Sequence, residues 1–291
     1  MLAFFIILVI INYMIKNNPI GLVDSGIGGL TVVKEAQKQL PNEQLIYIGD
    51  TARMPYGPKS EQEVIDYTFQ MANYLINEQN IKMLVIACNT ATARALSKLQ
   101  QKLSIPVVGV IEPGAEAAVS ASKNNKIGLI ATQGTVSSHV YSKKMLTLNP
   151  NIEIFAQAEP DFVALVENNN FLSLEAHDIV MQHLSTLKME NIDTLILGCT
   201  HFPLLATYIQ EAVGSGVTLV DSGAKTVDVM TRYLEQMNLR SEITYSHDND
   251  IYNTTGDLNI FNTIASSWLE REHELDVRHL NIVDNHLEDE K

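Results

Sequence analysis

The sequence is poor in cysteine and in positive charge. Its 291 residues include two cysteines and one tryptophan, and 20 Lys and Arg stand against 34 Asp and Glu, for a formal net charge of −14. Two cysteines do not make a disulfide framework, and two free thiols indicate a reducing compartment. The excess of acidic residues argues against nucleic acid and anionic membranes as partners, because a protein binds either of them through a basic face. An anionic substrate must therefore be held by local N–H groups and hydroxyls.

A membrane-spanning run is also missing. The longest apolar run near the N-terminus covers residues 2–11, which is too short for a bilayer that needs about 20 residues. The first basic residue, Lys16, follows this run, so the stretch lacks the basic start of a signal peptide. We interpret residues 1–17 as an apolar N-terminal extension and expect Met14 to be the true start. A membrane tether is the alternative.

Nucleotide-binding motifs are absent as well. The stretch DSGIGG at residues 24–29 is similar to a dinucleotide fingerprint, but Thr31 occupies the position of its third glycine. The sequence contains no Walker-type motif either. What the turn offers is a carboxylate and a hydroxyl, Asp24 and Ser25, at the end of a predicted strand. Both side chains are equally suited to capping the helix that follows.

Strand and helix patterns alternate regularly along the chain. The hydrophobic content of 46% is ample for a core. Regular βα alternation predicts mainly parallel sheets with helices on both faces. Apolar strands are expected near residues 20–23, 45–48, 83–87, 106–110, 127–131, 152–156, 194–198 and 217–220.

One apolar stretch, residues 84–92, ends abruptly in Cys88, Asn89 and Thr90. It is typical of a buried strand followed by a helix, which places Cys88 beyond the carboxyl end of a parallel strand, where α/β proteins bind ligands. The N-terminus of the helix would favour a thiolate there. A single cysteine in such a position is more often a small buried apolar side chain, so this stretch alone indicates little.

The second cysteine repeats the same plan. Residues 194–203 lead from an apolar strand into Cys199 and a helix that can start at Pro203. The two cysteines are 111 residues apart, and the similar strand ends at Asp24 and Ala131 are 107 residues apart. Two features in the same order at nearly the same offset predict two related halves. We therefore predict an α/β fold of two pseudo-symmetric doubly wound domains with mainly parallel sheets and the active site in the cleft between them.

The chain is expected to cross twice between these halves. The first domain would comprise residues 18–114 and 225–270, and the second domain residues 115–224. Residues 271–291 end in the acidic sequence EDEK and are expected to form a solvated C-terminal tail.

Five blocks of sequence carry a family resemblance. They are DSGIGGLTV at residues 24–32, PYGP at 55–58, ACNTA at 87–91, GVIEPG at 109–114 and GCTHFPL at 198–204. In this order, over residues 18–270, they resemble the aspartate/glutamate racemase family, and its glutamate racemases in particular. The resemblance implies interconversion of L- and D-glutamate without pyridoxal phosphate, any other cofactor or a metal. It also implies a cytoplasmic enzyme that supplies D-glutamate for peptidoglycan.

The resemblance also implies roles for individual residues. Inverting an α-carbon needs an acid and a base on opposite faces, and the family positions for them are Cys88, acting on D-glutamate, and Cys199, acting on L-glutamate. Asp24 would assist Cys88, and His201 would assist Cys199. The substrate-binding positions are Asp24, Ser25, Pro55, Tyr56, Gly57, Asn89, Thr90, Thr132, Thr135, Thr200 and His201.

Other functions remain open on the sequence alone. An aspartate racemase of the same family would act on a substrate only one methylene shorter, and a thiol redox or binding protein would use the same two cysteines. A zinc site is disfavoured, because one residue separates Cys199 from His201 and no second cluster has zinc spacing. We expect a homodimer with a small-molecule substrate and no nucleic-acid partner.

Overall fold

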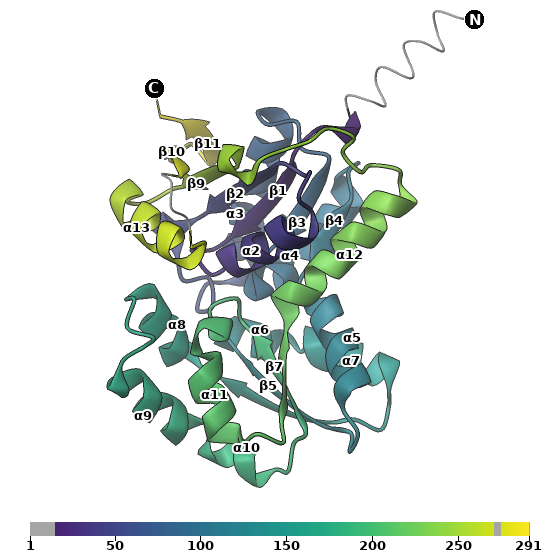
Figure 1. The fold of residues 1–291 in the computed structure, drawn as a ribbon, viewed down its shortest axis with the longest axis vertical. Helices are drawn as coiled ribbons and strands as arrows, with labels where there is room; N and C mark the ends of the chain where they lie inside the picture. Colours follow the sequence, from purple (N-terminus) through teal and green to yellow (C-terminus); the bar gives the residue numbers. More distant parts are fainter. Residues whose placement is uncertain (1–14, 271–274, 291) are drawn as a thin grey trace, which may run out of the picture.

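The computed structural model describes residues 15–270 and 275–290. Over these residues the chain forms two lobes, each built around one sheet (Figure 1). The upper lobe in Figure 1 contains both the start and the end of the described chain, and the lower lobe contains the middle. The two lobes meet where the strands of both sheets end, and this junction is where the sequence places its polar motifs.

The first sheet has seven strands within the described residues. They are β1 (Ile20–Asp24), β2 (Leu45–Gly49), β3 (Met83–Ile86), β4 (Val107–Gly109), β9 (Ile251–Thr254), β10 (Asp276–Val283) and β11 (His286–Asp289). Their order is β11-β10-β9-β2-β1-β3-β4. All neighbours pair in parallel except β10 and β11, which pair antiparallel.

The second sheet, in the part of the chain that the structure describes, has four parallel strands in the order β6-β5-β7-β8. They are β5 (Lys126–Ala131), β6 (Glu153–Ala158), β7 (Thr194–Gly198) and β8 (Thr218–Asp221). The order β2-β1-β3-β4 in the first sheet is the same arrangement. Strand β3, before Cys88, therefore corresponds to β7, before Cys199. The predicted class of two related, mainly parallel α/β domains is confirmed.

Helices follow the strands and pack on both sides of each sheet (Figure 1). Side-chain caps start several of them; Ser60 and Glu63 form a capping box at α3, for example. The α-helices among the described residues are α2 (Leu30–Gln39), α3 (Glu61–Asn77), α4 (Asn89–Lys102), α5 (Ile111–Ala121), α6 (Gln133–Ser138), α7 (Val140–Leu148), α8 (Pro160–Glu167), α9 (Leu174–His183), α10 (Ser185–Met189), α11 (Ala206–Val213), α12 (Ser222–Gln236) and α13 (Leu258–Trp268). Short 3₁₀ turns cover Thr51–Arg53, Phe202–Leu205 and His247–Asn249.

The central strands are buried on both faces. Leu22 and Val85 belong to one core cluster, while their neighbours Val23, Leu84 and Ile86 belong to another on the opposite face of the sheet. This is why these strands are continuous apolar runs and do not alternate with polar residues. Because side chains pack on both faces of these strands, the strand ends are rigid. The positions of the residues that follow each strand are therefore well defined.

The chain crosses between the sheets in two helices. Helix α5 connects β4 with β5, and α12 connects β8 with β9 and packs against both α2 and α5. The domain boundaries expected from the sequence, at residues 114 and 224, lie within these two helices.

The described part of the C-terminal segment, residues 275–290, differs from the solvated tail that we expected over residues 271–291, of which residues 271–274 and 291 lie outside the described residues. Strand β10 extends the first sheet beside β9, and β11 turns back along it. Leu280 is fully buried, and Leu287 is only 6% exposed. The acidic residues led us to expect a tail, but two apolar side chains are enough to anchor an edge hairpin whose charges face solvent.

At the other end, residues 1–14 of the expected N-terminal extension lie outside the described residues. Lys16 pairs with Glu242, and the side chain of Asn17 accepts a hydrogen bond from the backbone N–H of Glu242 at 3.1 Å. Residues 16 and 17 therefore lie against the first domain. No helix within residues 15–270 or 275–290 is long and apolar enough to cross a bilayer.

The anchoring of the hairpin can be measured. Leu280→Ala removes a fully buried side chain from β10, so we expect the free energy of unfolding to fall by about 2–5 kcal/mol. Ile282→Ala, in the same strand but 39% exposed, is the matched control and should change it by about 1 kcal/mol or less. Urea-unfolding curves followed by circular dichroism compare the two variants. Equal losses in both would mean that the hairpin adds no buried core.

Candidate functional site

Polar side chains from both domains gather at the junction of the lobes. β1 ends at Asp24, Cys88 follows β3 after one residue, and Cys199 directly follows β7. Cys88 occupies the position before α4, where its Sγ accepts a hydrogen bond from the backbone N–H of Ala91 at 3.5 Å. Both cysteines are free thiols and are buried, with exposed fractions of 5% and 6%.

One cavity collects almost all the residues that the sequence analysis selected. Of these, Asp24, Ser25, Pro55, Tyr56, Gly57, Cys88, Asn89, Thr90, Thr132, Cys199, Thr200 and His201 line it. Thr135 is the exception, because it lies behind the wall with its hydroxyl 3.1 Å from that of Thr132 and 3.4 Å from that of Thr90. The two thiols therefore share one cavity, one from each domain.

The cavity is small and adjoins a larger apolar one. About 20 Å³ is open to the centre of a water-sized sphere, which is close to the space that a single water molecule needs. The neighbouring cavity, of about 320 Å³, shares the lining residues Met54, Pro55, Gly57, Thr132, Val163 and Glu167. The loop at 54–57 and one face of α8 thus separate the two spaces.

On one side of the cavity, Cys199 is joined to His201 and Glu167. His201 Nδ1 lies 3.4 Å from Cys199 Sγ, and its Nε2 contacts the Glu167 carboxylate. Burial alone would lower the pKa of His201, but negative charge on Cys199 and Glu167 raises that pKa well above its usual range. His201 is therefore placed to hold a proton beside Cys199 Sγ, where a charged imidazole stabilises a thiolate.

The surroundings of Cys88 favour the opposite protonation state. Its Sγ lies 3.6 Å from Ser25 Oγ. Burial, assisted by the negative charge of Asp24, raises the pKa of the Cys88 thiol far above its ordinary value. Burial also raises the pKa of Asp24, against the opposing effects of His201 and two backbone N–H groups. Cys88 is therefore held as a neutral thiol at neutral pH.

The lining holds buried polar atoms that are suited to a polar ligand. Tyr141 on α7 donates a hydrogen bond to Asn89 Oδ1 at 2.8 Å, which leaves the Asn89 amide nitrogen as the outward donor. This nitrogen, Asp24 Oδ1 and Glu167 Oε2 are, among the described lining residues, the buried side-chain atoms without a hydrogen-bond partner. Buried polar atoms in that condition lower stability, so their presence in the cavity fits contacts with a substrate.

Sequence reasoning missed three lining residues: Met54, Val163 and Glu167. Met54 directly precedes the PYGP block, so its neighbourhood was a usable signal. Val163 and Glu167 lie on α8, far from every motif, and carry no local signal. Glu167 reaches the cavity because α8 packs on the turn after Cys199, where Phe162 meets Phe202 edge to face.

Metal-ligating geometry is not formed in the part of the chain that the structure describes. No group of three or more His, Cys, Asp and Glu side chains there is placed to hold a metal ion. Within the cavity, His201 contacts Cys199 through Nδ1 and Glu167 through Nε2. The arrangement suits proton transfer among thiols, imidazole and carboxylates.

Comparison with known proteins decides the family. A model of the Asp/Glu/hydantoin racemase family matches residues 30–230. The chain belongs to this family. Its membership confirms the resemblance carried by the five sequence blocks and identifies the protein as a racemase.

Individual family members are similar over nearly the whole chain. A glutamate racemase of Lactiplantibacillus plantarum is 50% identical over 256 residues, which are 88% of this chain and 93% of that protein. The crystal structure of a glutamate racemase isoform from Bacillus anthracis has a TM-score of 0.87 and 40% identity, and the match covers 92% of this chain and 98% of that one. A glutamate racemase from Francisella tularensis, solved in complex with D-glutamate, has a TM-score of 0.82 and 34% identity, covering 93% and 98%.

The two thiols should differ in reactivity. Because a thiolate is the nucleophile, iodoacetamide at pH 7 should label Cys199 about tenfold faster than Cys88. As the pH rises towards the high pKa of Cys88, the difference should narrow. Peptide mass spectrometry over time measures both rates in one sample.

The same experiment tests whether His201 causes the faster labelling of Cys199. His201→Gln removes the imidazolium beside Cys199, so it should slow labelling of Cys199 towards the rate of Cys88. His286→Gln, at an exposed position of β11, is the control and should leave both rates unchanged. Faster labelling of Cys88 than of Cys199 at pH 7 in the unaltered protein would overturn this assignment.

Proposed function

We propose that the protein interconverts L- and D-glutamate by proton transfer between two thiols, without a cofactor. The observation that carries the proposal is that Cys88 and Cys199, each at the end of a corresponding strand of one domain, line the same cavity. The family and relatives named glutamate racemases support the same activity.

The reaction follows from the placement of the thiols. Racemisation removes the α-proton from one face of the carbon and returns a proton to the other, so two groups must flank it. Cys199, as thiolate, takes the proton of L-glutamate and becomes a thiol, while the Cys88 thiol gives its proton to the opposite face and becomes a thiolate. In the reverse direction the two exchange roles. Proton transfers through His201 and Asp24 restore the starting state.

The resting protonation state is asymmetric. The raised pKa of Cys88 keeps that group protonated, and the imidazolium of His201 supports a thiolate on Cys199. The resting enzyme is therefore ready for the enantiomer on which Cys199 acts, which the family assigns as L-glutamate. Starting from D-glutamate, Asp24 is the carboxylate beside Cys88 that accepts its proton.

Glutamate carries two carboxylates, although the protein is acidic overall. The α-carboxylate must be held by donors that also stabilise the carbanionic transition state. Asn89 Nδ2, the hydroxyl of Ser25 and the N-terminus of α4 supply them. For the side-chain carboxylate we assign the hydroxyls of Thr90 and Thr132, supported by Thr135, together with the loop at 55–57. Local dipoles thus replace positive side chains.

The wider biological role is part of the proposal. By its family, the protein supplies D-glutamate for peptidoglycan synthesis in the cytoplasm, and it works as a homodimer. L-Aspartate is the substrate against which the assignment has to be tested, because a single methylene separates the two amino acids.

Solvent isotope exchange tests the mechanism. Purified protein is incubated with L-glutamate in deuterated water after treatment with a chelator, and optical rotation and α-deuterium are followed together. We expect rotation to be lost as deuterium enters the α-position. Cys88→Ala and Cys199→Ala should each lower the rate by about 10²–10⁴, because each removes one acid/base group.

The outcomes separate the alternatives. Turnover of L-aspartate with L-glutamate inert would keep the mechanism and overturn the substrate. Full activity in either cysteine variant would overturn the two-thiol mechanism. Loss of activity on chelation would overturn the metal-free assignment.

The role of Glu167 predicts a shift in pH dependence. The raised pKa of His201 keeps the imidazolium through neutral pH, and it is lost only on the alkaline side. Glu167→Gln removes one negative charge that raises this pKa, so the pKa falls. The alkaline limb of kcat/KM against pH should therefore move to lower pH by about one to three units. Glu175→Gln, on the exposed start of α9, is the control. An unmoved limb would contradict the role given to Glu167.

A further inference from the structure

The loop at residues 50–57 forms one wall of the cavity. Met54, Pro55, Tyr56 and Gly57 all line it. We propose that Arg53, which does not line the cavity, is a positioning residue that holds this wall through Asp50 and Tyr56. The inference rests on the proposed racemase activity and assigns a specific residue to the geometry of its site.

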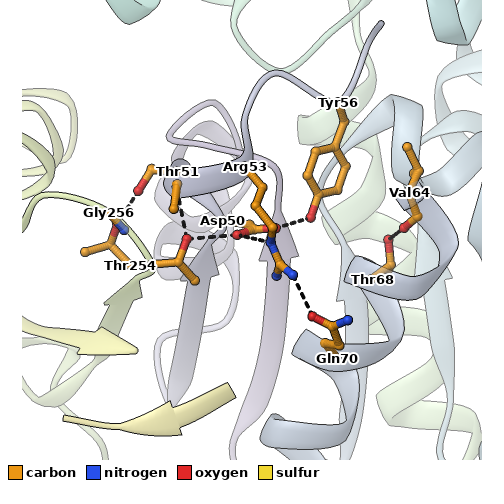
Figure 2. A network of polar contacts seen from close by, with 11 residues as sticks. Asp50, Thr51, Arg53, Tyr56, Val64, Thr68, Gln70, Thr254 and Gly256 are labelled. Atoms are coloured by element: carbon orange, nitrogen blue, oxygen red, sulfur yellow. Dashed lines mark hydrogen bonds and ion pairs between the residues drawn. The ribbon is translucent and has the colours of Figure 1, made fainter. Parts of the chain in front are cut away.

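Asp50 is the centre of the arrangement (Figure 2). Its side chain is fully buried, and both carboxylate oxygens accept from Arg53 Nε, at 3.0 and 2.8 Å. One oxygen also accepts from the hydroxyl of Tyr56, and the other from Thr255 Oγ1 at 2.8 Å. A buried carboxylate with this many donors is well satisfied only while its cation is present.

Arg53 is itself fixed by groups on α3. Its Nη1 donates to Gln70 Oε1 at 2.6 Å, and its guanidinium lies 4.1 Å from the ring centre of Tyr67. The Arg53 side chain is 13% exposed. A planar guanidinium can make the carboxylate contact, the amide contact and the ring stack at once, whereas a lysine ammonium cannot. Arg53 thus joins Asp50, at the start of the loop, to Tyr67 and Gln70 on α3.

The base of the loop is tied to another part of the first domain. Thr51 Oγ1 lies 2.6 Å from Thr254 Oγ1, and the backbone N–H of Ala52 donates to Thr255 Oγ1 at 3.1 Å. Its tip is held against the second domain: a Cβ placed on Gly134 would lie 2.8 Å from the Gly57 carbonyl oxygen. A small movement of the loop therefore changes the space between the domains.

Tyr56 transmits the position of Asp50 to the cavity. Figure 2 shows its hydroxyl directed at Asp50. The same residue is one of those that line the cavity. The ring is 1% exposed and packs beside Tyr67, with ring centres 5.8 Å apart. If Asp50 loses its contact with Arg53, its carboxylate is no longer held in one position. The Tyr56 hydroxyl then has no fixed acceptor, and the position of residues 55–57 in the wall is no longer fixed.

A double-mutant cycle tests this connection. Arg53→Gln should lower kcat/KM for glutamate racemisation about tenfold, the effect of one charge-assisted hydrogen bond, mainly through a higher KM. In a Tyr56→Phe background, the same substitution should change kcat/KM by less than about twofold, because the connection is already broken. Arg53→Lys should fall between Arg53→Gln and the unaltered protein. Because enantiomers have equal free energy, kcat/KM must match in the two directions for every variant, which checks the assays.

Amide hydrogen exchange gives a readout that does not depend on activity. In Arg53→Gln, exchange in the peptide covering residues 51–58 should rise about tenfold, and exchange elsewhere should stay the same. Arg278→Gln is the matched control, since the exposed side chain of Arg278 pairs with Asp276 on β10, and it should change neither exchange nor kinetics.

The two proposals fail separately. An Arg53→Gln enzyme with unchanged kcat/KM, or with the same loss in both Tyr56 backgrounds, would overturn the positioning role and leave the racemase activity standing. If the unaltered protein does not racemise glutamate, the proposed function fails. In that case the exchange of residues 51–58 still decides whether Arg53 holds the loop.

Discussion

The structure depends on one geometric constraint: two side chains must reach the same small space from opposite sides. A parallel sheet brings the carboxyl ends of its strands to one edge. Here two sheets with the same strand order turn those edges toward each other, and the corresponding strands β3 and β7 each deliver a cysteine. The helices α5 and α12, which cross between the domains, keep the edges in register. The pairing of the thiols is thus a property of the fold as a whole.

The two thiols are equivalent in topology but not in electrostatics. Cys199 faces an imidazole that Glu167 supports, while Cys88 faces a hydroxyl and a buried carboxylate. Identical surroundings would give the two thiols equal affinity for a proton, and no defined acid and base. In the mechanism that we propose, this difference assigns one group to each role before a substrate binds. The repeated strand order supplies the symmetry, and local side chains supply the asymmetry that the chemistry needs.

How much of this could be predicted from sequence depends on whether the signal is local. The strands were predictable because apolar runs between turns are local, and the two cysteines because their contexts repeat. Glu167 was not predictable, since it reaches His201 only through the packing of Phe162 on Phe202. Tyr141 is similar, because it contacts Asn89 across the junction of the domains. At the C-terminus, we predicted a solvated tail from the acidic residues of the segment. That prediction gave too little weight to Leu280 and Leu287, the two apolar side chains that anchor the hairpin.

The small volume of the cavity bears on how the chemistry can work. Space for roughly one water molecule cannot hold glutamate, so the walls must separate to admit it and close around it. Closure removes solvent, which strengthens the interaction of His201 and Asp24 with the thiols and keeps solvent protons from the carbanionic centre. The same closure requires a wall that returns to one position each time. The loop at residues 50–57 meets that requirement. Asp50 anchors it to two elements of the first domain, and its tip lies against the second domain. The loop can therefore move together with the first domain as a rigid part of that domain. Precision at the thiols and mobility between the domains are then compatible.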